Sequence, residues 1–310
     1  MRGPGGSDRR VALIGAPSGL GLRAPGVQGL GDALLGHGLA QSLGAKSAGT
    51  VRPPAPSGVR DPISDVLNGP EVAAYAVALA DAVGDVLDAG DMPLVLGGDC
   101  SVLLGGMLAM RRRGGAGLLF LDGHADFHEP QADALGEAAS MDLALVSGHG
   151  PRAVGDIEGR APLVRVEDTV IVGARDAQER ERDGSQPLPG ALLALDLAAI
   201  REVGAAAAAA RAIGHLTRTD APPCFWIHID ADVLDDAVMP AVDYRLPGGL
   251  SADELYTFLA AAMACGRVAG AEITIYNPTL DPDGTAGAGL SDVVVRGLGR
   301  TADGARTSRG

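Results

Sequence analysis

The chain has few aromatic residues, few cysteines and no long apolar stretch. Aromatic side chains make up only 3% of its 310 residues, so a hydrophobic core must be built mainly from Ala, Leu, Val and Ile. The three cysteines, Cys100, Cys224 and Cys265, form neither an even set nor a CxxC pair. This excludes a disulfide framework and favours a reducing, cytoplasmic compartment. No stretch of about 18 uncharged apolar residues predicts a membrane span, and residues 1–10 lack the apolar segment of a secretory signal.

Positive charge is also scarce. The formal net charge of −14 and the pI near 4.7 argue against nucleic acid or an anionic membrane as a partner. They are compatible with a cationic small-molecule substrate, although acidity is also common for solubility alone. A hydrophobic content of 46% and a mean hydropathy of +0.17 suffice for a sizeable core. The length fits one large α/β domain or two smaller ones.

Apolar runs alternate with segments of helical spacing along the chain. The runs that predict buried strands are 11–14, 93–96, 117–121, 169–172, 224–229 and 268–275. The segments that predict helices are 33–43, 71–87, 101–113, 141–147, 205–216, 253–265 and a last helix from about 290. Segment 192–197 is ambiguous between strand and helix, and 45–61, rich in Pro, Gly and Ser, is expected to be a surface loop. The alternation predicts a doubly wound parallel sheet in one domain over residues 11–300, with disordered tails at 1–10 and 301–310.

A cluster of metal-binding residue types follows the run 117–121. Asp122, His124, Asp126 and His128 fall within seven residues. The carboxyl edge of a parallel sheet is where α/β enzymes place their chemistry, and carboxylate and imidazole groups suit hard or borderline divalent metals. Taken alone, this stretch is also compatible with an acidic loop that leaves a strand.

Two further strand ends carry the same chemistry. Asp99 and Cys100 follow the run 93–96, and Asp230 and Asp232 follow the run 224–229. Strand alternation places the side chains of Asp230 and Asp232 on the same side of the chain. Carboxylates that converge at one sheet edge repel each other strongly unless cations balance them. A pair of divalent ions is the simplest solution, and it predicts a hydrolytic centre that activates water.

These motifs resemble those of the ureohydrolases, the family of arginase and agmatinase. The similar runs, in the family order, are Leu96–Ser101, Leu121–His128 and Ile229–Asp235, with support from Arg23–Gln28, Pro247–Ser251 and Tyr276–Pro278. The resemblance implies a three-layer α/β/α fold with a central mostly parallel sheet, a dinuclear Mn(II) centre, hydrolysis of a guanidino C–N bond, and a homo-oligomer (trimer or hexamer). It also implies the metal ligands: Asp122 and Asp230 bridge both ions, Asp126 and Cys100 complete one ion, and His124 and Asp232 complete the other.

Three positions depart from the family pattern. Cys100 stands where the family's first motif has His. Some relatives that hydrolyse Nω-hydroxy-arginine also have Cys at this position. Cys100 is a softer thiolate ligand, or leaves its ion weakly held, or is a bystander. Ile275 stands where arginase-like enzymes carry the Glu that holds the guanidinium through paired hydrogen bonds. Strand alternation points the side chain of Glu272 to the face opposite that of Ile275. Glu272 is therefore not an obvious substitute for the missing Glu. The family's proton-shuttling His corresponds to Ala139. We therefore expect a substrate other than arginine itself.

The remaining candidate residues are expected around the metals. Asp126 would orient the attacking hydroxide, and His128 would protonate the leaving group or bind a substrate carboxylate. Glu181 would line the mouth of the site, and Arg245 would meet an anionic substrate group. His228 is expected to be a satisfied histidine behind the sheet. The leading hypothesis is a hydrolase of a guanidino or hydroxyguanidino compound. Two alternatives stay open: hydrolysis of another planar C–N substrate such as a formimino compound, and a catalytically silent binding subunit.

Overall fold

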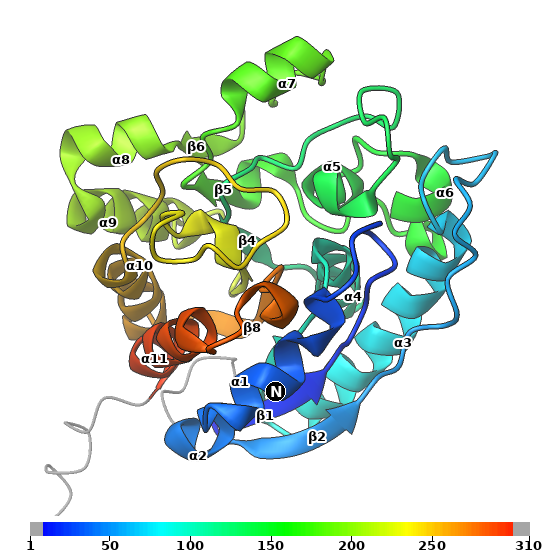
Figure 1. Cartoon of the computed structure of the whole chain (residues 1–310). Helices are drawn as coiled ribbons and strands as arrows, with labels where there is room; N and C mark the ends of the chain where they lie inside the picture. Colours follow the sequence, from blue (N-terminus) through cyan, green and yellow to red (C-terminus); the bar gives the residue numbers. More distant parts are fainter. Residues whose placement is uncertain (1–8, 300–310) are drawn as a thin grey trace, which may run out of the picture.

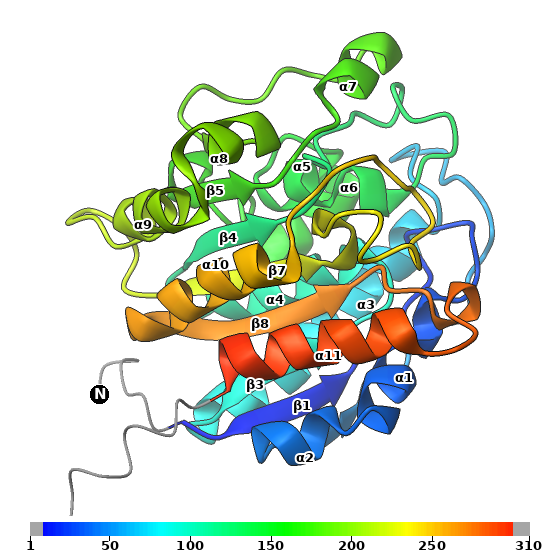
Figure 2. The same cartoon turned by 60° about the vertical axis from the view of Figure 1, so that its left-hand side comes forward.

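A parallel β-sheet organises residues 9–299, the part of the chain that the computed structural model describes. The strands follow each other in the order β2-β1-β3-β8-β7-β4-β5-β6, and every neighbouring pair is parallel (Figures 1 and 2). They are β1 (Val11–Gly15), β2 (Lys46–Thr50), β3 (Met92–Leu96), β4 (Gly117–Leu121), β5 (Thr169–Val172), β6 (Leu193–Leu195), β7 (Phe225–Asp230) and β8 (Val268–Thr274).

Helices cover both faces of this sheet, which confirms the predicted three-layer α/β/α fold (Figures 1 and 2). One layer consists of α1 (Leu30–Gly36), α2 (Leu39–Leu43), α8 (Leu197–Val203), α9 (Ala205–Leu216), α10 (Ala252–Ala264) and α11 (Thr285–Leu298). The other consists of α3 (Gly69–Asp88), α4 (Leu103–Arg111), α5 (Asp142–Val146) and α6 (Arg152–Gly155). Helix α7 (Ala177–Asp183) buries none of its residues and stands away from the sheet. Short 3-10 helices are η1 (Val27–Gly29), η2 (Cys100–Val102), η3 (Ala138–Ser140), η4 (Ile157–Gly159), η5 (Val166–Asp168), η6 (Ala231–Val233) and η7 (Pro278–Leu280).

The central strands are apolar along their length because helices cover both of their faces. Every residue of β3, β4 and β8 is buried. On β4, Leu119 belongs to one apolar core and Phe120 to the other, as strand alternation requires. The carboxyl ends of β3, β8, β7 and β4 are adjacent in the sheet, so the segments that follow them meet at one edge.

The structure differs from the expectations mainly at an edge of the sheet. Lys46–Thr50 lies within the expected loop 45–61 but forms β2, which pairs with β1 starting at Ala12. All five residues of β2 are exposed, so no apolar alternation marks it as a strand. The predicted helix 33–43 is two helices, because the chain adopts a left-handed φ of 82° at Gly38 between them.

Smaller differences concern the C-terminal half. The ambiguous segment 192–197 contains the short strand β6, and the last helix begins at Thr285, earlier than expected. The tails predicted to be disordered, 1–10 and 301–310, lie outside the described residues apart from residues 9 and 10. Among the described helices, none combines the length and apolar character that crossing a membrane requires.

Candidate metal centre

The predicted ligands lie at the carboxyl ends of β3, β4 and β7, where short turns hold them. After β3, the side chain of Asp99 caps η2 and accepts a hydrogen bond from the Ser101 N–H at 2.9 Å. At the end of β7, the side chain of Asp230 caps η6 and accepts one from the Asp232 N–H at 2.8 Å. Each cap gives a hydrogen-bond partner to a backbone N–H group that has no strand partner where the chain turns. The two carboxylates of the β7 motif are therefore fixed relative to each other.

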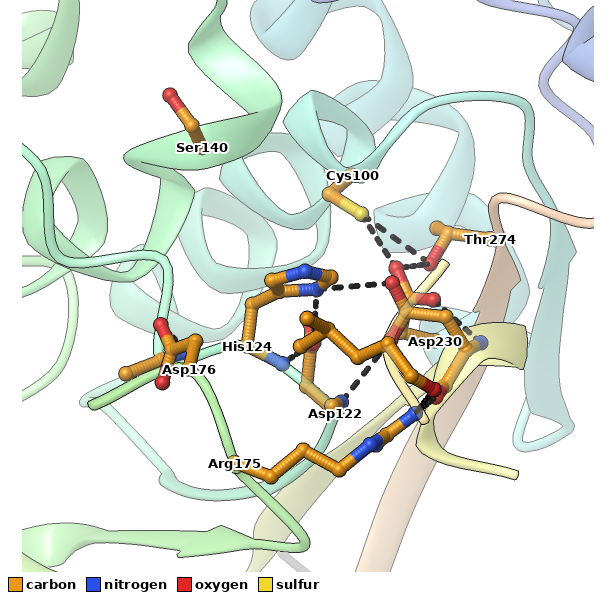
Figure 3. Close-up of polar contacts among 12 residues, drawn as sticks. Cys100, Asp122, His124, Ser140, Arg175, Asp176, Asp230 and Thr274 are labelled. Carbon is orange, nitrogen blue, oxygen red and sulfur yellow. Dashed lines mark hydrogen bonds and ion pairs between the residues drawn. The ribbon is translucent and has the colours of Figure 1, made fainter. Parts of the chain in front are cut away.

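One group of candidate ligands consists of Asp122, His124 and Asp232. Figure 3 labels the first two. His124 Nδ1 lies 2.9 Å from Asp232 Oδ2, and the His124 N–H donates to Asp122 Oδ1 at 2.6 Å. Asp232 Oδ1 accepts a hydrogen bond from the Gly123 N–H at 3.0 Å. One ligand atom from each of the three side chains lies within 4.8 Å of the other two. This group can therefore bind one ion.

Cys100 is fully buried beside a second group of carboxylates. Its thiol donates to Asp230 Oδ2 at 2.8 Å (Figure 3). Burial, together with the charge of Asp230 and nearby carboxylates, raises the pKa of the thiol well above its usual value. Its sulfur is within 4.8 Å of ligand atoms of Asp122 and Asp230 in one group, and of Asp126 and Asp142 in another. Cys100 thus lies among the candidate ligands and does not point away from them.

Asp142, the first residue of α5, joins the site although the sequence did not single it out. It is fully buried, and its Oδ2 has no hydrogen-bond partner among the described residues. It belongs to a group of candidate ligands with Cys100 and Asp126. The only signal in the sequence is one acidic residue at the start of the otherwise apolar run Met141–Val146, and helix starts commonly carry such residues.

The electrostatics of the centre favour bound cations. Burial and the charges of neighbouring carboxylates raise the pKa values of Asp126, Asp142 and Asp230 well above their usual range. Burial alone would also raise the pKa of Asp232, but the adjacent His124 lowers it to about 2. Divalent cations stabilise ionised carboxylates in such an environment. The donor set of carboxylates and imidazole fits divalent ions, with one softer sulfur at Cys100.

Two residues that follow β5 brace the loops of the centre (Figure 3). The guanidinium of Arg175 donates to the carbonyl oxygen of Asp232 at 2.8 Å. Asp176 Oδ2 accepts a hydrogen bond from the Ala125 N–H at 3.0 Å. Both contacts hold backbone that carries ligands from different strands, so they fix the distance between the β4 and β7 motifs.

A cavity of about 510 Å³ opens onto the metal centre. His128 and Arg245 are among the residues that line it. Arg245 forms an ion pair with Asp236, in which Arg245 Nε lies 2.5 Å from Asp236 Oδ1. Glu181 is exposed on α7 and is not among the lining residues, whereas Glu179 of the same helix is. The orientation of this short helix depends on tertiary contacts, so the residue of α7 that faces the cavity could not be read from the sequence.

Ile275 and Ala139, which depart from the family pattern together with Cys100, also line this cavity. Ile275 is only 5% exposed and has a left-handed φ of 69°, which is unfavourable for a β-branched residue. Ala139 is also buried and lines the cavity. Glu272 does not substitute for the missing carboxylate, because it is fully buried with Oε1 2.8 Å from His228 Nδ1. His228 is buried, but the expectation of a fully satisfied histidine is wrong: only Nδ1 is hydrogen-bonded, and Nε2 has no partner among the described residues.

A polar wall of the cavity was not predicted. The Tyr244 hydroxyl donates to Glu137 Oε2 at 2.6 Å, and the Arg23 N–H donates to Glu137 Oε1 at 2.6 Å. Burial raises the pKa of Glu137 despite these contacts. Other carboxylates that line the cavity away from the centre are Asp133, Glu179, Asp183 and Asp243. They outnumber the lining arginines, Arg182 and Arg245, so the cavity favours a cationic molecule.

The chain belongs to the arginase family: the family's sequence model matches residues 10–296. It is 32% identical over 205 residues to an arginase of Brevibacillus brevis, an alignment that covers 66% of this chain and 67% of that protein. It is 29% identical over 215 residues to an N(omega)-hydroxy-L-arginine amidinohydrolase of Streptomyces lavendulae, covering 69% of this chain and 71% of that protein. The resemblance predicted from the motifs is therefore confirmed.

Solved structures share the fold over nearly the whole chain. The arginase of Bacillus subtilis superposes with a TM-score of 0.82 at 24% identity, covering 95% of this chain and 100% of that one. Proclavaminate amidino hydrolase of Streptomyces clavuligerus superposes with a TM-score of 0.69 at 17% identity, covering 95% of this chain and 92% of that one. With the family assignment, this defines the chain as a hydrolase of the arginase family whose structure gathers candidate metal ligands at one edge of the sheet.

Proposed function

We propose that this protein is a dinuclear manganese-dependent amidinohydrolase that cleaves a C–N bond of a guanidino or hydroxyguanidino compound other than arginine. The observation that carries the proposal is the convergence of buried carboxylates, imidazole and thiol from three strand ends on one cavity. A silent binding subunit would not require this costly burial of like charges, whereas a metal centre does.

The centre offers ligands for two ions. Asp122, His124 and Asp232 would hold one, and Cys100 with neighbouring carboxylates would hold the other. The chemistry that such ions supply when bound is a water of lowered pKa near neutral pH. Asp122 Oδ2 has no hydrogen-bond partner among the described residues, which suits a carboxylate that bridges two ions.

Two side chains beside the centre are assigned to the proton transfers. Asp126 would accept a hydrogen bond from the attacking water and orient it toward the guanidino carbon. As the new C–O bond forms, the water would give up a proton to Asp126, and the C–N bond to the amine would break. His128, which lines the cavity, would donate the proton that the leaving amine needs. The products are the amine and urea, or hydroxyurea from a hydroxyguanidine.

The choice of substrate rests on the cavity residues. Ile275 places an apolar side chain where a guanidinium would otherwise meet a carboxylate, which disfavours a fully charged guanidinium at that point. The polar wall of Glu137 and Tyr244 still suits a cationic or hydrogen-bonding group farther from the metals. Relatives that are named arginases make arginine the necessary comparison substrate. Nω-hydroxy-arginine, the hydroxylated form of arginine, is the second substrate to compare, because another relative is named for it.

The test is product release by purified, manganese-loaded protein: urea from a guanidine, hydroxyurea from a hydroxyguanidine and formamide from a formimino compound. Arginine, Nω-hydroxy-arginine, agmatine, guanidino acids and a formimino compound are compared at equal concentration. We expect turnover of a hydroxylated or otherwise modified guanidine to exceed that of arginine. Asp126→Asn should lower kcat by about 100-fold or more, as expected when one acid–base group is lost. Asp292→Asn, an exposed carboxylate on α11, serves as the matched control. Absence of turnover on every substrate, with two ions bound, would support the silent subunit instead.

A further inference from the structure

His228 lies on β7, two residues before Asp230, and strand alternation places both side chains on the same face of the sheet. Its side chain is fully buried, and its ring stacks on Phe120 with a centroid distance of 4.6 Å and an interplanar angle of 8°. The stacking fixes the plane of the imidazole. The ring can therefore present its nitrogens only within that plane.

One ring nitrogen of His228, Nδ1, is hydrogen-bonded to Glu272. Glu272 is the β8 residue paired with His228 in the sheet, and its Oε1 lies 2.8 Å from His228 Nδ1. An ionised carboxylate only accepts hydrogen bonds, so this contact places a proton on Nδ1. In the neutral form of the ring, Nε2 then carries the lone pair that a metal ion needs. A carboxylate behind a histidine is the arrangement that orients metal-ligating imidazoles in proteins.

The other ring nitrogen faces the candidate metal centre. His228 Nε2 has no hydrogen-bond partner among the described residues, and neither does the nearby Asp122 Oδ2. These atoms are 3.7 Å apart, which is too long for a hydrogen bond. Both atoms are buried, and burial costs each of them its hydrogen bonds to water. No hydrogen bond among the described residues offsets that desolvation cost.

A shared ion accounts for both atoms. Ligand atoms of Cys100, Asp122, His228 and Asp230 all lie within 4.8 Å of one another. Ligand atoms that are each about 2.0–2.3 Å from one ion lie within roughly 4.6 Å of one another, so small side-chain adjustments suffice. The four side chains come from three strand ends and are fully buried, which makes this a built site.

We infer that His228 is a ligand of the ion on the Cys100 side of the centre, and that Glu272 is the positioning residue that fixes its orientation. The inference rests on the proposed dinuclear function and adds an imidazole to a set of one thiol and two carboxylates. The alternative is an imidazolium that bridges Glu272 and Asp122 without touching metal. Its ring would carry protons on both nitrogens.

The experiment observes the metal rather than turnover. Wild-type protein with 15N-labelled histidine is loaded with 113Cd²⁺, and the 113Cd–15N couplings are recorded by NMR. We expect couplings to two different imidazoles, those of His124 and His228, the latter through Nε2. A wild type in which His228 shows no coupling and carries protons on both nitrogens would overturn the inference. This measurement does not depend on any variant folding.

Binding of Mn²⁺ alone, measured by elemental analysis after equilibrium dialysis, gives the second readout. His228→Gln should weaken one of the two ions by at least 100-fold, and Glu272→Gln should weaken it by about 10- to 100-fold. His215→Gln is the control, because that imidazole is bonded to the Glu167 carbonyl and is not part of any candidate ligand group among residues 9–299. Unchanged affinity in folded His228→Gln refutes the ligand role. A wild type that binds no Mn²⁺ refutes the proposed function itself, a separate outcome.

Discussion

The replacement Ile275→Glu tests why this cavity should not prefer arginine. Ile275 lines the cavity and is 5% exposed, so a carboxylate at this position would meet the guanidino group of a bound substrate. Two charge-assisted hydrogen bonds would form, each contributing about 1.5–3 kcal/mol. Desolvation of the new carboxylate offsets about one of them. The net gain is about 1.5–3 kcal/mol, or roughly 10- to 100-fold in kcat/KM for arginine.

Backbone strain must be separated from this gain. Residue 275 has a φ of 69°, and a non-glycine residue there costs about 1–3 kcal/mol. An unbranched side chain lowers that cost whether or not it is charged. Ile275→Gln is therefore the matched control, because it shares the shape and the relief of strain but not the negative charge.

The assay compares kcat/KM for arginine and for Nω-hydroxy-arginine in the wild type and in both variants. The Glu variant should shift the ratio toward arginine by about 10-fold or more relative to the Gln variant. If the two variants shift the ratio equally, the apolar side chain at 275 does not set the substrate. A wild type that already prefers arginine would show that the guanidinium is held by other residues.

Three further predictions concern the metals and stability. Asp230→Ala should abolish manganese binding and turnover, as measured by elemental analysis and product release, since Asp230 belongs to the candidate ligand group around Cys100; retained turnover contradicts a dinuclear centre. Cys100→His should keep or raise Mn²⁺ affinity in equilibrium dialysis, because Mn²⁺ prefers imidazole to thiolate, and a clear fall in affinity would contradict its placement at the metal. Burial alone would raise the pKa of Asp281, but hydrogen bonds from the Gly287 N–H and the Tyr276 hydroxyl lower it below its usual value. Its contribution to stability is therefore present above pH of about 4 and is lost as the pH falls through the lowered pKa. With a chelator present, wild-type protein should lose more stability on acidification than Asp281→Asn, and parallel melting curves would refute the assignment.

Part of the site depends on contacts that no local pattern encodes. Glu272 and His228 are neighbours because β7 and β8 pair in register, although the two residues are far apart in the chain. Likewise, Tyr244 reaches Glu137 across more than a hundred residues of sequence. Each of these residues looks unremarkable in its own segment. Their roles come from strand pairing and loop packing, which single-segment periodicity does not specify.

The sequence by itself determined the central strands and the metal motifs that follow them. A strand covered on both faces must be apolar throughout, so Gly117–Leu121 is visible without a structure, and Asp122 and His124 are placed by their position directly after it. Tertiary structure alone decided the exposed edge strand β2, the burial of Asp142 beside Cys100, and the outward position of Glu181. These depend on which surfaces other segments cover. The physical reason is that burial and charge proximity belong to the folded arrangement, whereas hydrophobic periodicity belongs to the chain.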